Sequence, residues 1–444
     1  MHAGKGETIF ALASGRGRSA VAVIRISGPH CLAALSLAGG KLPKPRYATL
    51  RTLSDPQSNE ELDRAIVINF PGPQSFTGEN MLEFQVTGAP AVINGVLAAL
   101  SKVDGLRPAE QGEFARRAFE AGKMDLSEVE GLADLIEAET SEQRRRALRI
   151  AGGALRRESD EIRGLVIKGA AAIEAQLDFG DVEDTDAMSS GAQEVIGEAL
   201  ERVRKGLGES VGAERLRDGL VVAIVGLPNA GKSTLMNVLA RRDVSIVSAI
   251  PGTTRDVIEV ALELRGFPVL LLDTAGIRAT DDGVELEGVA RARKRAETAD
   301  LVLWLAESGA AFPPDELAPE RVILVATKMD LRQQEQKADF AAAKWLEVSA
   351  LTGKGVPELL DEVARFAAQQ LAPTCSALLT RERHRSAFRS AERALARSLL
   401  HRDEDADLAA EDLRLAARAL ERVSGRIEVE EILDEVFARL CVGK

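Results

Sequence analysis

A chain of 444 residues is long enough for about three domains, and its 45% hydrophobic, 28% charged and only 4% aromatic content favours globular, mainly helical structure over disorder. Three scattered cysteines and four histidines exclude a disulfide framework and a zinc cluster, and the absence of an apolar signal core or a membrane-length stretch predicts a cytoplasmic protein without membrane contact. The net charge of −12 opposes broad binding of nucleic acid, so any RNA contact must be local.

The first 118 residues alternate strand-like and helix-like segments. Val21–Ile26 and Ala65–Phe70 are predicted strands, and Ala91–Leu100 is a predicted helix. Gly-Pro turns at Gly28–Pro29 and Pro71–Pro73 separate these segments. The sequence therefore predicts an N-terminal α/β domain.

A helical pattern begins at Asp125, where Ser127 and Glu130 are expected to form a capping box. It continues to Leu177, and after an acidic turn helix is expected again from Ala192 to Leu207. Arginines cluster in this region and in the second helical region, at Arg144, Arg145, Arg146 and Arg149 and at Arg381, Arg383, Arg385 and Arg389. They are either local RNA contacts or solvated helix faces.

A phosphate site is predicted in the next stretch. Leu220–Val225 has the length and composition of a buried parallel strand and leads into the pattern G-x-x-x-x-G-K-[ST] at Gly226–Ser233. Backbone N–H groups of such a loop surround phosphates, Lys232 faces the β- and γ-oxygens, and Ser233 offers a hydroxyl to Mg²⁺. A chance match is the alternative, which the preceding strand and a predicted helix over Leu235–Ala240 disfavour.

The phosphate-sensing segments follow in order. Strands predicted over Val257–Leu264 and Pro268–Leu272 precede Asp273–Gly276, whose carboxylate and last amide can meet Mg²⁺ and a γ-phosphate. Thr254, in the preceding loop, can bring a second hydroxyl to the metal.

Further strands predicted over Leu301–Ala306 and Val322–Ala326 lead to a base-recognition segment, Thr327–Asp330, and Trp345–Val348 leads into Ser349. Asp330 can accept hydrogen bonds from N1–H and the 2-amino group of guanine, an edge that adenine lacks. The ordered set predicts a doubly wound GTPase domain.

Three side chains need separate interpretation. Thr327 stands where GTPases have Asn and is too short to make both the base and the P-loop contacts of that amide, so we expect weaker nucleotide binding with guanine specificity kept. Ile277 cannot orient a water as a Gln does, which leaves Glu285 as the nearest candidate or as a solvated acid. Asn229, taken alone, is a turn residue.

Helix is expected again from Leu378, with breaks at 403–405 and 424–425. The simplest architecture is multidomain α/β and α, with a P-loop domain inserted into an all-α domain. The expected domains are 1–118 (α/β), 119–218 and 372–444 (helical) and 219–371 (GTPase).

These motifs resemble the MnmE (TrmE) family of tRNA modification GTPases over the whole chain. The GTPase stretches Pro251–Asp256 and Asp273–Arg278 and the final Leu440–Lys444 are similar to the family patterns. The N-terminal stretches that match are Gly15–Gly17, Val23–Gly28, Phe76–Glu83 and Gly112–Leu126. Thr87–Ala89 departs from the usual His-Gly-Gly, which alters the local loop.

The resemblance implies an N-terminal domain that binds a 5-formyl- or 5,10-methylene-tetrahydrofolate and forms a homodimer. The matching pocket positions are Arg25, Glu83, Lys123 and Lys444. A carboxylate suits the donor edge of a pterin and cations suit the glutamate tail, although each residue singly is an ordinary surface charge.

For the GTPase domain the resemblance implies a K⁺ site at Asn229, Ser248, Ile250 (through its carbonyl) and Thr253, and it makes Glu285 the residue that positions the attacking water. Ser233 and Thr254 are the expected Mg²⁺ ligands, and Lys232 is a further expected catalytic residue. Cys441 and Lys444 are expected to belong to the modification site, where Cys441 is catalytic, and not to the GTPase. The expected GTP-binding positions are Asn229, Ala230, Gly231, Lys232, Ser233, Thr234, Ser248, Ala249, Ile250, Pro251, Gly252, Thr253, Thr254, Asp273, Thr274, Ala275, Gly276, Thr327, Lys328, Asp330, Ser349, Ala350 and Leu351.

The implied reaction adds an aminomethyl or carboxymethylaminomethyl group to C5 of the wobble uridine, position 34, of certain tRNAs, in a heterotetramer with an FAD protein of the MnmG (GidA) type. The alternative is a regulatory or ribosome-assembly GTPase without one-carbon chemistry. Only the N-terminal pocket and the tail with Cys441 separate the two. That cysteine could also be a packing residue, because Val436, Phe437, Leu440 and Cys441 fall at helical spacing.

Overall fold

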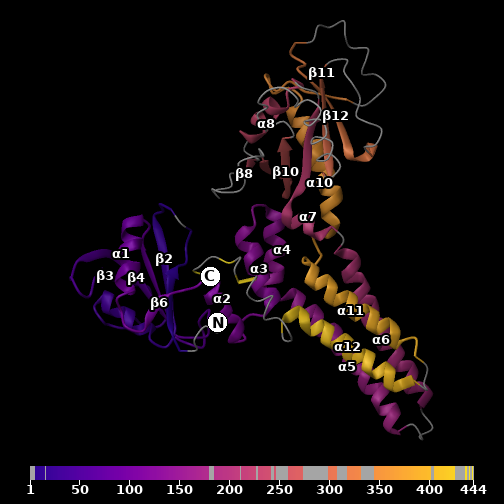
Figure 1. Cartoon of the computed structure of the whole chain (residues 1–444), viewed down its shortest axis with the longest axis horizontal. Coiled ribbons are helices and arrows are strands. Elements are labelled where there is room, and N and C mark those ends of the chain that lie inside the picture. The colour runs from indigo at the N-terminus through magenta and orange to yellow at the C-terminus, as the bar shows by residue number, and fades with distance from the viewer. Residues whose placement is uncertain are drawn as a thin grey trace, which may run out of the picture. The chain divides into compact units, whose positions relative to one another are not determined.

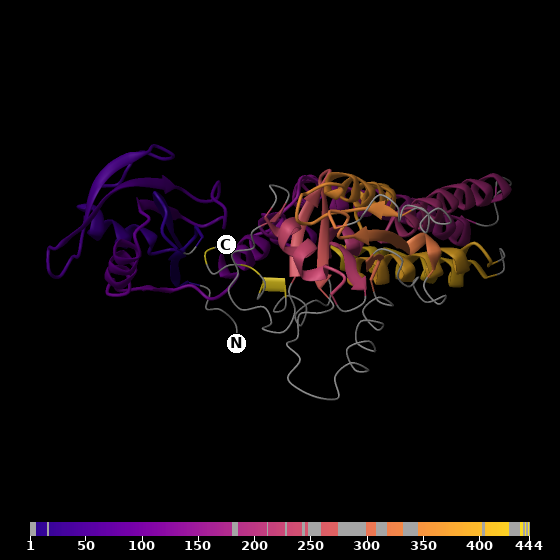
Figure 2. The same ribbon diagram turned by 90° about the horizontal axis from the view of Figure 1, so that it is seen from above.

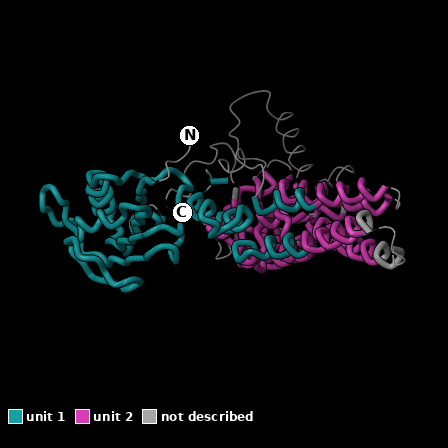
Figure 3. The backbone as a smooth tube through the Cα atoms, turned by 90° about the horizontal axis from the view of Figure 1, so that it is seen from below, with its two compact units in different colours: residues 1–133, 150–161, 417–444 teal, residues 134–149, 162–416 magenta. Residues whose placement is uncertain are grey.

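A computed structural model describes the chain over residues 6–15, 17–179, 185–210, 212–226, 229–241, 245–246, 259–273, 299–307, 318–331, 345–401, 405–425, 436–437, 440 and 443 (Figure 1). The chain divides into two compact units, residues 1–133, 150–161 and 417–444 and residues 134–149 and 162–416 (Figure 3). Among the described residues, no helix combines the length and apolar character needed to cross a membrane.

The first unit contains a six-stranded sheet in the order β3-β4-β5-β2-β1-β6. The strands are β1 (Thr8–Leu12), β2 (Val21–Ser27), β3 (Thr49–Ser54), β4 (Glu61–Phe70), β5 (Met81–Thr87) and β6 (Leu106–Pro108). Neighbours are antiparallel except β1 and β6, which are parallel. The β2–β5 register places Arg25 opposite Glu83, so both side chains leave the same face of the sheet.

The other face of this sheet is apolar because strand residues alternate in direction. In β2, Ala22, Ile24 and Ile26 are buried, and they pack with residues of helix α1 (Pro90–Leu100) and of the 3₁₀ helix η1 (Cys31–Ala38). Helix α1 lies beside the strands of this sheet (Figures 1 and 2). The predicted strands and helix of this region are confirmed. The sequence analysis did not predict β1, β3, β5 and β6 as strands, although β5 carries the family motif that ends at Glu83.

The second unit contains a seven-stranded sheet in the order β13-β12-β11-β7-β10-β9-β8. The strands are β7 (Leu220–Gly226), β8 (Ser245–Ile246), β9 (Glu259–Leu264), β10 (Phe267–Asp273), β11 (Leu301–Glu307), β12 (Val322–Thr327) and β13 (Leu346–Glu347). They are parallel from β13 to β10, whereas β9 and β8 are antiparallel to their neighbours. This confirms the doubly wound fold predicted for this part of the chain.

Strand β7 is central and buried on both faces, as its continuous apolar run predicts. Val222 and Ile224 join a core that includes α8 (Lys232–Ala240) and α10 (Val356–Leu371), while Ala223 and Val225 pack on the opposite side with Val302. Its carboxyl end therefore stands at a fixed place in the middle of the sheet, where the P-loop begins.

The helical parts comprise α2 (Glu113–Glu120), α3 (Leu126–Glu137), α4 (Ser141–Ala151), α5 (Ala154–Phe179), α6 (Thr185–Glu209), α7 (Ala213–Asp218), α11 (Glu382–Ser398) and α12 (Ala406–Ser424). Within the second unit α11 packs along α6 (Figure 1). Gly169 of α5 lies against Ile196 of α6, where its missing side chain permits close approach. The predicted break near 424–425 is confirmed, since α12 ends at Ser424 and Gly425 has a φ of 77°.

Two predicted helix boundaries are wrong. The capping box at the start of α3 is formed by Asp125 and Glu128, not by Ser127 and Glu130. The Glu128 amide donates to Asp125 Oδ1 over 2.8 Å and the Asp125 amide donates to Glu128 Oε2 over 2.7 Å. A carboxylate one residue before the helix can reach the amide three positions on, whereas Ser127 lies inside the helix and donates to Asp125. The helix expected from Ala192 begins earlier, at Thr185.

Candidate functional site

The P-loop follows β7 directly. Gly226 packs so closely on Leu305 of β11 that a side chain here would overlap the Leu305 carbonyl oxygen, and Asn229 and Gly231 have left-handed φ values of 63° and 87°. Lys232 begins α8, and its Nζ donates to the Gly226 carbonyl over 2.9 Å. The Lys232 side chain therefore reaches back to Gly226, the first residue of the loop. Lys232 stands at the N-terminus of α8, and helix N-termini are suited to bind phosphate.

Thr327, at the end of β12, is tied to the P-loop. Its hydroxyl oxygen lies 2.8 Å from the Ala230 carbonyl oxygen and 3.3 Å from that of Ala306, and only 6% of the residue is exposed. The side chain therefore makes the P-loop contact that an amide would make at this position.

The base-recognition segment is held from two sides. Ser349 donates its hydroxyl to Asp330 Oδ1 over 2.5 Å, and the Thr352 amide donates to Ser349 over 3.2 Å. Lys328 has a φ of 57°, and its Nζ lies 2.9 Å from Glu307 Oε2. These contacts orient the Asp330 carboxylate, and the sequence alone did not indicate the link between Ser349 and Asp330.

Several predicted site residues lie outside the described residues. They are Ser248, Ala249, Ile250, Pro251, Gly252, Thr253, Thr254, Thr274, Ala275, Gly276, Glu285, Cys441 and Lys444, and for Asp273 only the backbone is described. The described members, from the P-loop, β12 and the segment after β13, converge at the carboxyl ends of parallel strands, where doubly wound sheets bind ligands.

A second candidate site lies on the sheet of the first unit, around Arg25. Its guanidinium lies 3.0 Å from Glu83 Oε1, and the exposed fractions of the two side chains are 19% and 15%. The guanidinium also lies over two rings, 5.3 Å from the centre of Phe76 and 5.9 Å from that of Phe114. The Arg25–Glu83 pair is thus a charged centre with aromatic walls, and Phe76 and Phe114 are site residues that the sequence analysis did not single out.

The C-terminal tail reaches this pair. Arg25 donates from Nη1 to the carbonyl oxygen of Gly443 over 3.3 Å. Gly443 lies so close to Leu12 and Ala13 that a side chain would overlap their backbone. Phe437 is 1% exposed and packs at 6.3 Å from the ring of Phe119. The described tail residues Phe437 and Gly443 are therefore docked against the N-terminal part of this unit.

Lys123, the third described position of the predicted folate pocket, is exposed and runs against Gly78, two residues after Phe76. The next residue, Glu79, belongs to a partly buried ionic network. Arg117 contacts both Glu79 and Glu113, at 3.0 and 2.9 Å, and Arg107 contacts Glu113 at 2.7 Å. Burial opposes ionisation of Glu113, but these hydrogen bonds outweigh it and hold the pKa of Glu113 below its ordinary value.

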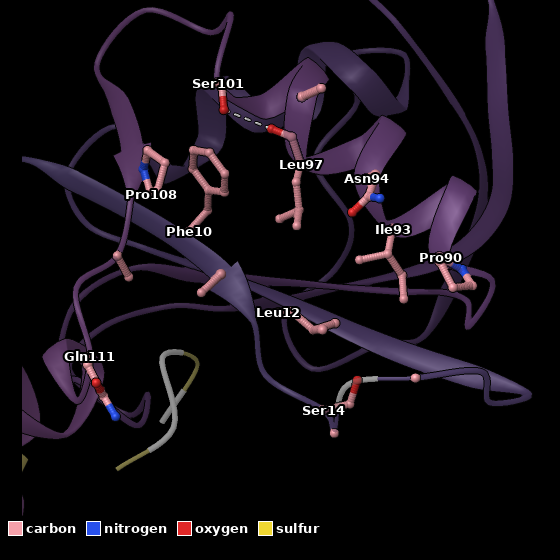
Figure 4. A pocket seen from close by; sticks show the side chains of 15 residues that line it. Phe10, Leu12, Ser14, Pro90, Ile93, Asn94, Leu97, Ser101, Pro108 and Gln111 are labelled. Atoms are coloured by element: carbon pink, nitrogen blue, oxygen red, sulfur yellow. Dashed lines mark hydrogen bonds between the residues drawn. The ribbon is translucent and has the colours of Figure 1, made fainter. Parts of the chain in front are cut away.

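A cavity of about 870 Å³ opens beside β1 in the same unit (Figure 4). Phe10, Leu12, Ile93 and Leu97 form apolar walls, and polar residues such as Gln111 lie at its edge. Leu12 lines the cavity and also contacts Gly443, so the cavity lies beside the docked tail. The three predicted folate residues that the structure describes, Arg25, Glu83 and Lys123, do not line it.

The arginine clusters are largely engaged within the protein. Arg146 is 4% exposed and donates to the Ala213 carbonyl over 2.7 Å, and burial lowers its pKa to about 10. Arg381 pairs with Asp134 at 2.6 Å, Arg385 pairs with Glu214, and Arg389 pairs with Glu382 at 2.7 Å. These four arginines therefore have partners within the protein.

The cysteines Cys31 and Cys375 are free thiols, and burial raises the pKa of Cys31 to about 12. In the part of the chain that the structure describes, no three His, Cys, Asp or Glu residues are grouped to hold a metal ion.

Comparison with known proteins gives matches to both the N-terminal and the helical regions. Residues 126–441 match the family model of the MnmE helical domain, and residues 8–123 match that of the GTP-binding protein TrmE N-terminus. The tRNA modification GTPase MnmE of Beijerinckia indica is 50% identical over 445 residues, which are 100% of this chain and 97% of that protein. The protein of the same name from a Bradyrhizobium species is 50% identical over 446 residues, 99% of each chain.

Among solved structures, Aquifex aeolicus Era bound to GDP and AlF4⁻ is 27% identical and covers 33% of this chain and 56% of that one, with a TM-score of 0.26. The full-length identity, and the helical-domain match over more than half of the chain, carry the assignment. The chain belongs to the MnmE family of tRNA modification GTPases.

Proposed function

We propose that this chain hydrolyses GTP as part of tRNA modification. The observation that carries the proposal is full-length identity of 50% to proteins of that name, joined to a P-loop and a fixed Asp330 at one edge of a doubly wound sheet. Residues 219–371 would form the GTPase domain, 1–118 the N-terminal domain, and 119–218 with 372–444 the helical domain.

In this proposal the chemistry of GTP hydrolysis rests on charge stabilisation and water positioning. Lys232 would neutralise the β- and γ-oxygens, while Ser233 and Thr254 would ligate Mg²⁺. A K⁺ ion held by Asn229, Ser248, Ile250 and Thr253 would offset charge that develops on the phosphates, and Glu285 would orient the attacking water. The left-handed Asn229 inside the P-loop supports this, because that conformation turns the loop around a ligand.

The modification step would use a tetrahydrofolate one-carbon donor in the first unit. The partly buried Arg25–Glu83 pair offers both a cation and a carboxylate, and Lys123 and Lys444 would bind the anionic tail. The docked tail would bring Cys441 to this site, and the apolar cavity beside it is within the size range of ligand pockets. A homodimer working with an FAD protein of the MnmG type would place the group on C5 of uridine 34.

Titration of the purified full chain with 5-formyl-tetrahydrofolate tests the folate part. Saturable binding that Glu83→Gln weakens about tenfold or more, with unchanged GTP hydrolysis, is expected because the variant removes the negative charge of the Arg25 pair. Glu61→Gln, on the exposed start of β4, is the matched control. Hydrolysis of GTP without any folate binding would favour a regulatory GTPase.

A further inference from the structure

The hydroxyl of Thr327 has one hydrogen to donate, and the described groups near it are hydrogen-bond acceptors. Both nearby groups, the carbonyl oxygens of Ala230 at 2.8 Å and Ala306 at 3.3 Å, are acceptors only. The site is 6% exposed, and Ala230 beside it is 2% exposed. The hydrogen is therefore committed to the protein, and the hydroxyl has none left to donate to a bound base.

An asparagine at this position would behave differently. Its amide carries two hydrogens, so one can go to the Ala230 carbonyl while the second reaches an acceptor on the base. On guanine the acceptor on that side of the ring is N7. Threonine makes the hydrogen bond to the Ala230 carbonyl and has no hydrogen left for a bond to N7.

Asp330 can still accept hydrogen bonds from N1–H and the 2-amino group, on the edge of guanine opposite N7. A carboxylate has about four acceptor positions, and Ser349 uses one of those on Oδ1. The positive φ of Lys328 and its contact with Glu307 hold the turn between the two residues, so Asp330 does not depend on Thr327 for its placement.

We propose that this chain recognises guanine at N1–H and the 2-amino group through Asp330 and leaves N7 unread, with Thr327 as the residue that determines this. The inference rests on the proposed GTP-binding function. Guanine nucleotides altered at N7 should then bind with the same affinity as GTP. A site with asparagine at this position should bind them more weakly than GTP.

The test compares GTP, 7-deaza-GTP, in which N7 is replaced by C–H, and inosine triphosphate, which lacks the 2-amino group. Competition binding to the full chain should give 7-deaza-GTP an affinity within about twofold of GTP, and inosine triphosphate an affinity about tenfold or more weaker, since Asp330 loses a donor. In Thr327→Asn, GTP should bind about three- to tenfold more tightly, and 7-deaza-GTP should now be weaker than GTP by a similar factor.

Two further variants keep the result interpretable. Thr327→Ser keeps the hydroxyl and should match the parent, while Thr327→Val loses the Ala230 contact and should weaken GTP and 7-deaza-GTP equally. A parent protein that binds 7-deaza-GTP fivefold or more weakly than GTP overturns the proposal, as does a Thr327→Asn protein that treats the two alike. A folded protein that binds none of the three nucleotides would instead contradict the proposed GTPase function.

Discussion

Asp330 combines two roles at the scale of a single residue. One oxygen is fixed by the Ser349 hydroxyl, which sets the direction of the carboxylate, and the remaining lone pairs are those that the base would use. Recognition of the base then depends on the acceptor character of this side chain, and a change of that character should change the preferred nucleotide.

Replacing Asp330 by Asn should reduce GTP affinity by about 10²-fold and favour xanthosine triphosphate, whose 2-oxo group accepts where guanine donates. Binding of the two nucleotides to parent and variant is the measurement. Asp361→Asn, an exposed residue of α10, is the control. Unchanged preference for GTP in Asp330→Asn would remove this residue from base recognition.

Turnover tests the proposed roles of K⁺ and Glu285. GTP hydrolysis should be much faster in K⁺ than in Na⁺, and Glu285→Ala should lose about 10²-fold or more in turnover while nucleotide binding is retained, as expected for a group that acts in the transition state. Equal rates in the two salts contradict the potassium site, and a normal rate in Glu285→Ala contradicts the water-positioning role.

At the scale of elements, strand ends and close contacts place the functional groups. The apolar run over Leu220–Val225 correctly predicted strand β7, which precedes the P-loop, because a strand buried on both faces has a distinct composition. Strand β5 was not predicted, although it carries part of a family motif. Attachment of the tail was expected through Lys444, whereas the contacts of Gly443 with Arg25 and of Phe437 with Phe119 were not, because they join distant segments. The misplaced capping box has a local cause: Asp125 competes with Ser127 as the acceptor, and the longer reach of its carboxylate satisfies the amide.

The docked tail predicts a separation of functions. Cys441→Ser should reduce wobble-uridine modification by about tenfold or more, in the presence of the flavin partner, and leave K⁺-stimulated GTP hydrolysis near normal. Gly443→Ala should do the same, because its added methyl would overlap the backbone at Leu12. The readouts are modified nucleoside in tRNA and phosphate release. Modification by Cys441→Ser at the parent rate would show that the cysteine only packs.

At the scale of the whole molecule, the fold class and the order of the motifs followed from the sequence, whereas the compact units did not. Residues 150–161 and 417–444 join the N-terminal unit although they are distant from it in the chain. Hydrophobic periodicity identifies which residues are buried but not which distant element covers them. The Glu113 network also reaches a distant segment, because Arg117 contacts Glu79, 38 residues away in the chain.

Acid stability depends on that network. Because the pKa of Glu113 is depressed in the folded protein, its contribution is fully present above the ordinary Glu pKa of about 4.3 and is lost as pH falls through the lower folded value. Glu113→Gln should cost about 3 kcal/mol at neutral pH, since Arg107 and Arg117 lose their buried partner.

Urea unfolding of parent and variant from pH 3 to 8 measures this, with Glu110→Gln, whose side chain is exposed, as the control. The difference between parent and Glu113→Gln should shrink toward the acid end. A difference that stays constant across the range would mean that the charge of Glu113 does not stabilise the fold.

The contact between Arg25 and Gly443 joins positions 418 residues apart, so it can form only after almost the whole chain has been synthesised. Ribosomes add about 5 to 20 residues per second, so the roughly 300 residues made after the N-terminal sheet delay its closing contact by about 15 to 60 s. During that interval the nascent sheet carries the Arg25–Glu83 pair without the carbonyl of the tail, and the place of Phe437 beside Phe119 stays open. The site around Arg25 is therefore among the last parts of the protein to be completed as it is made.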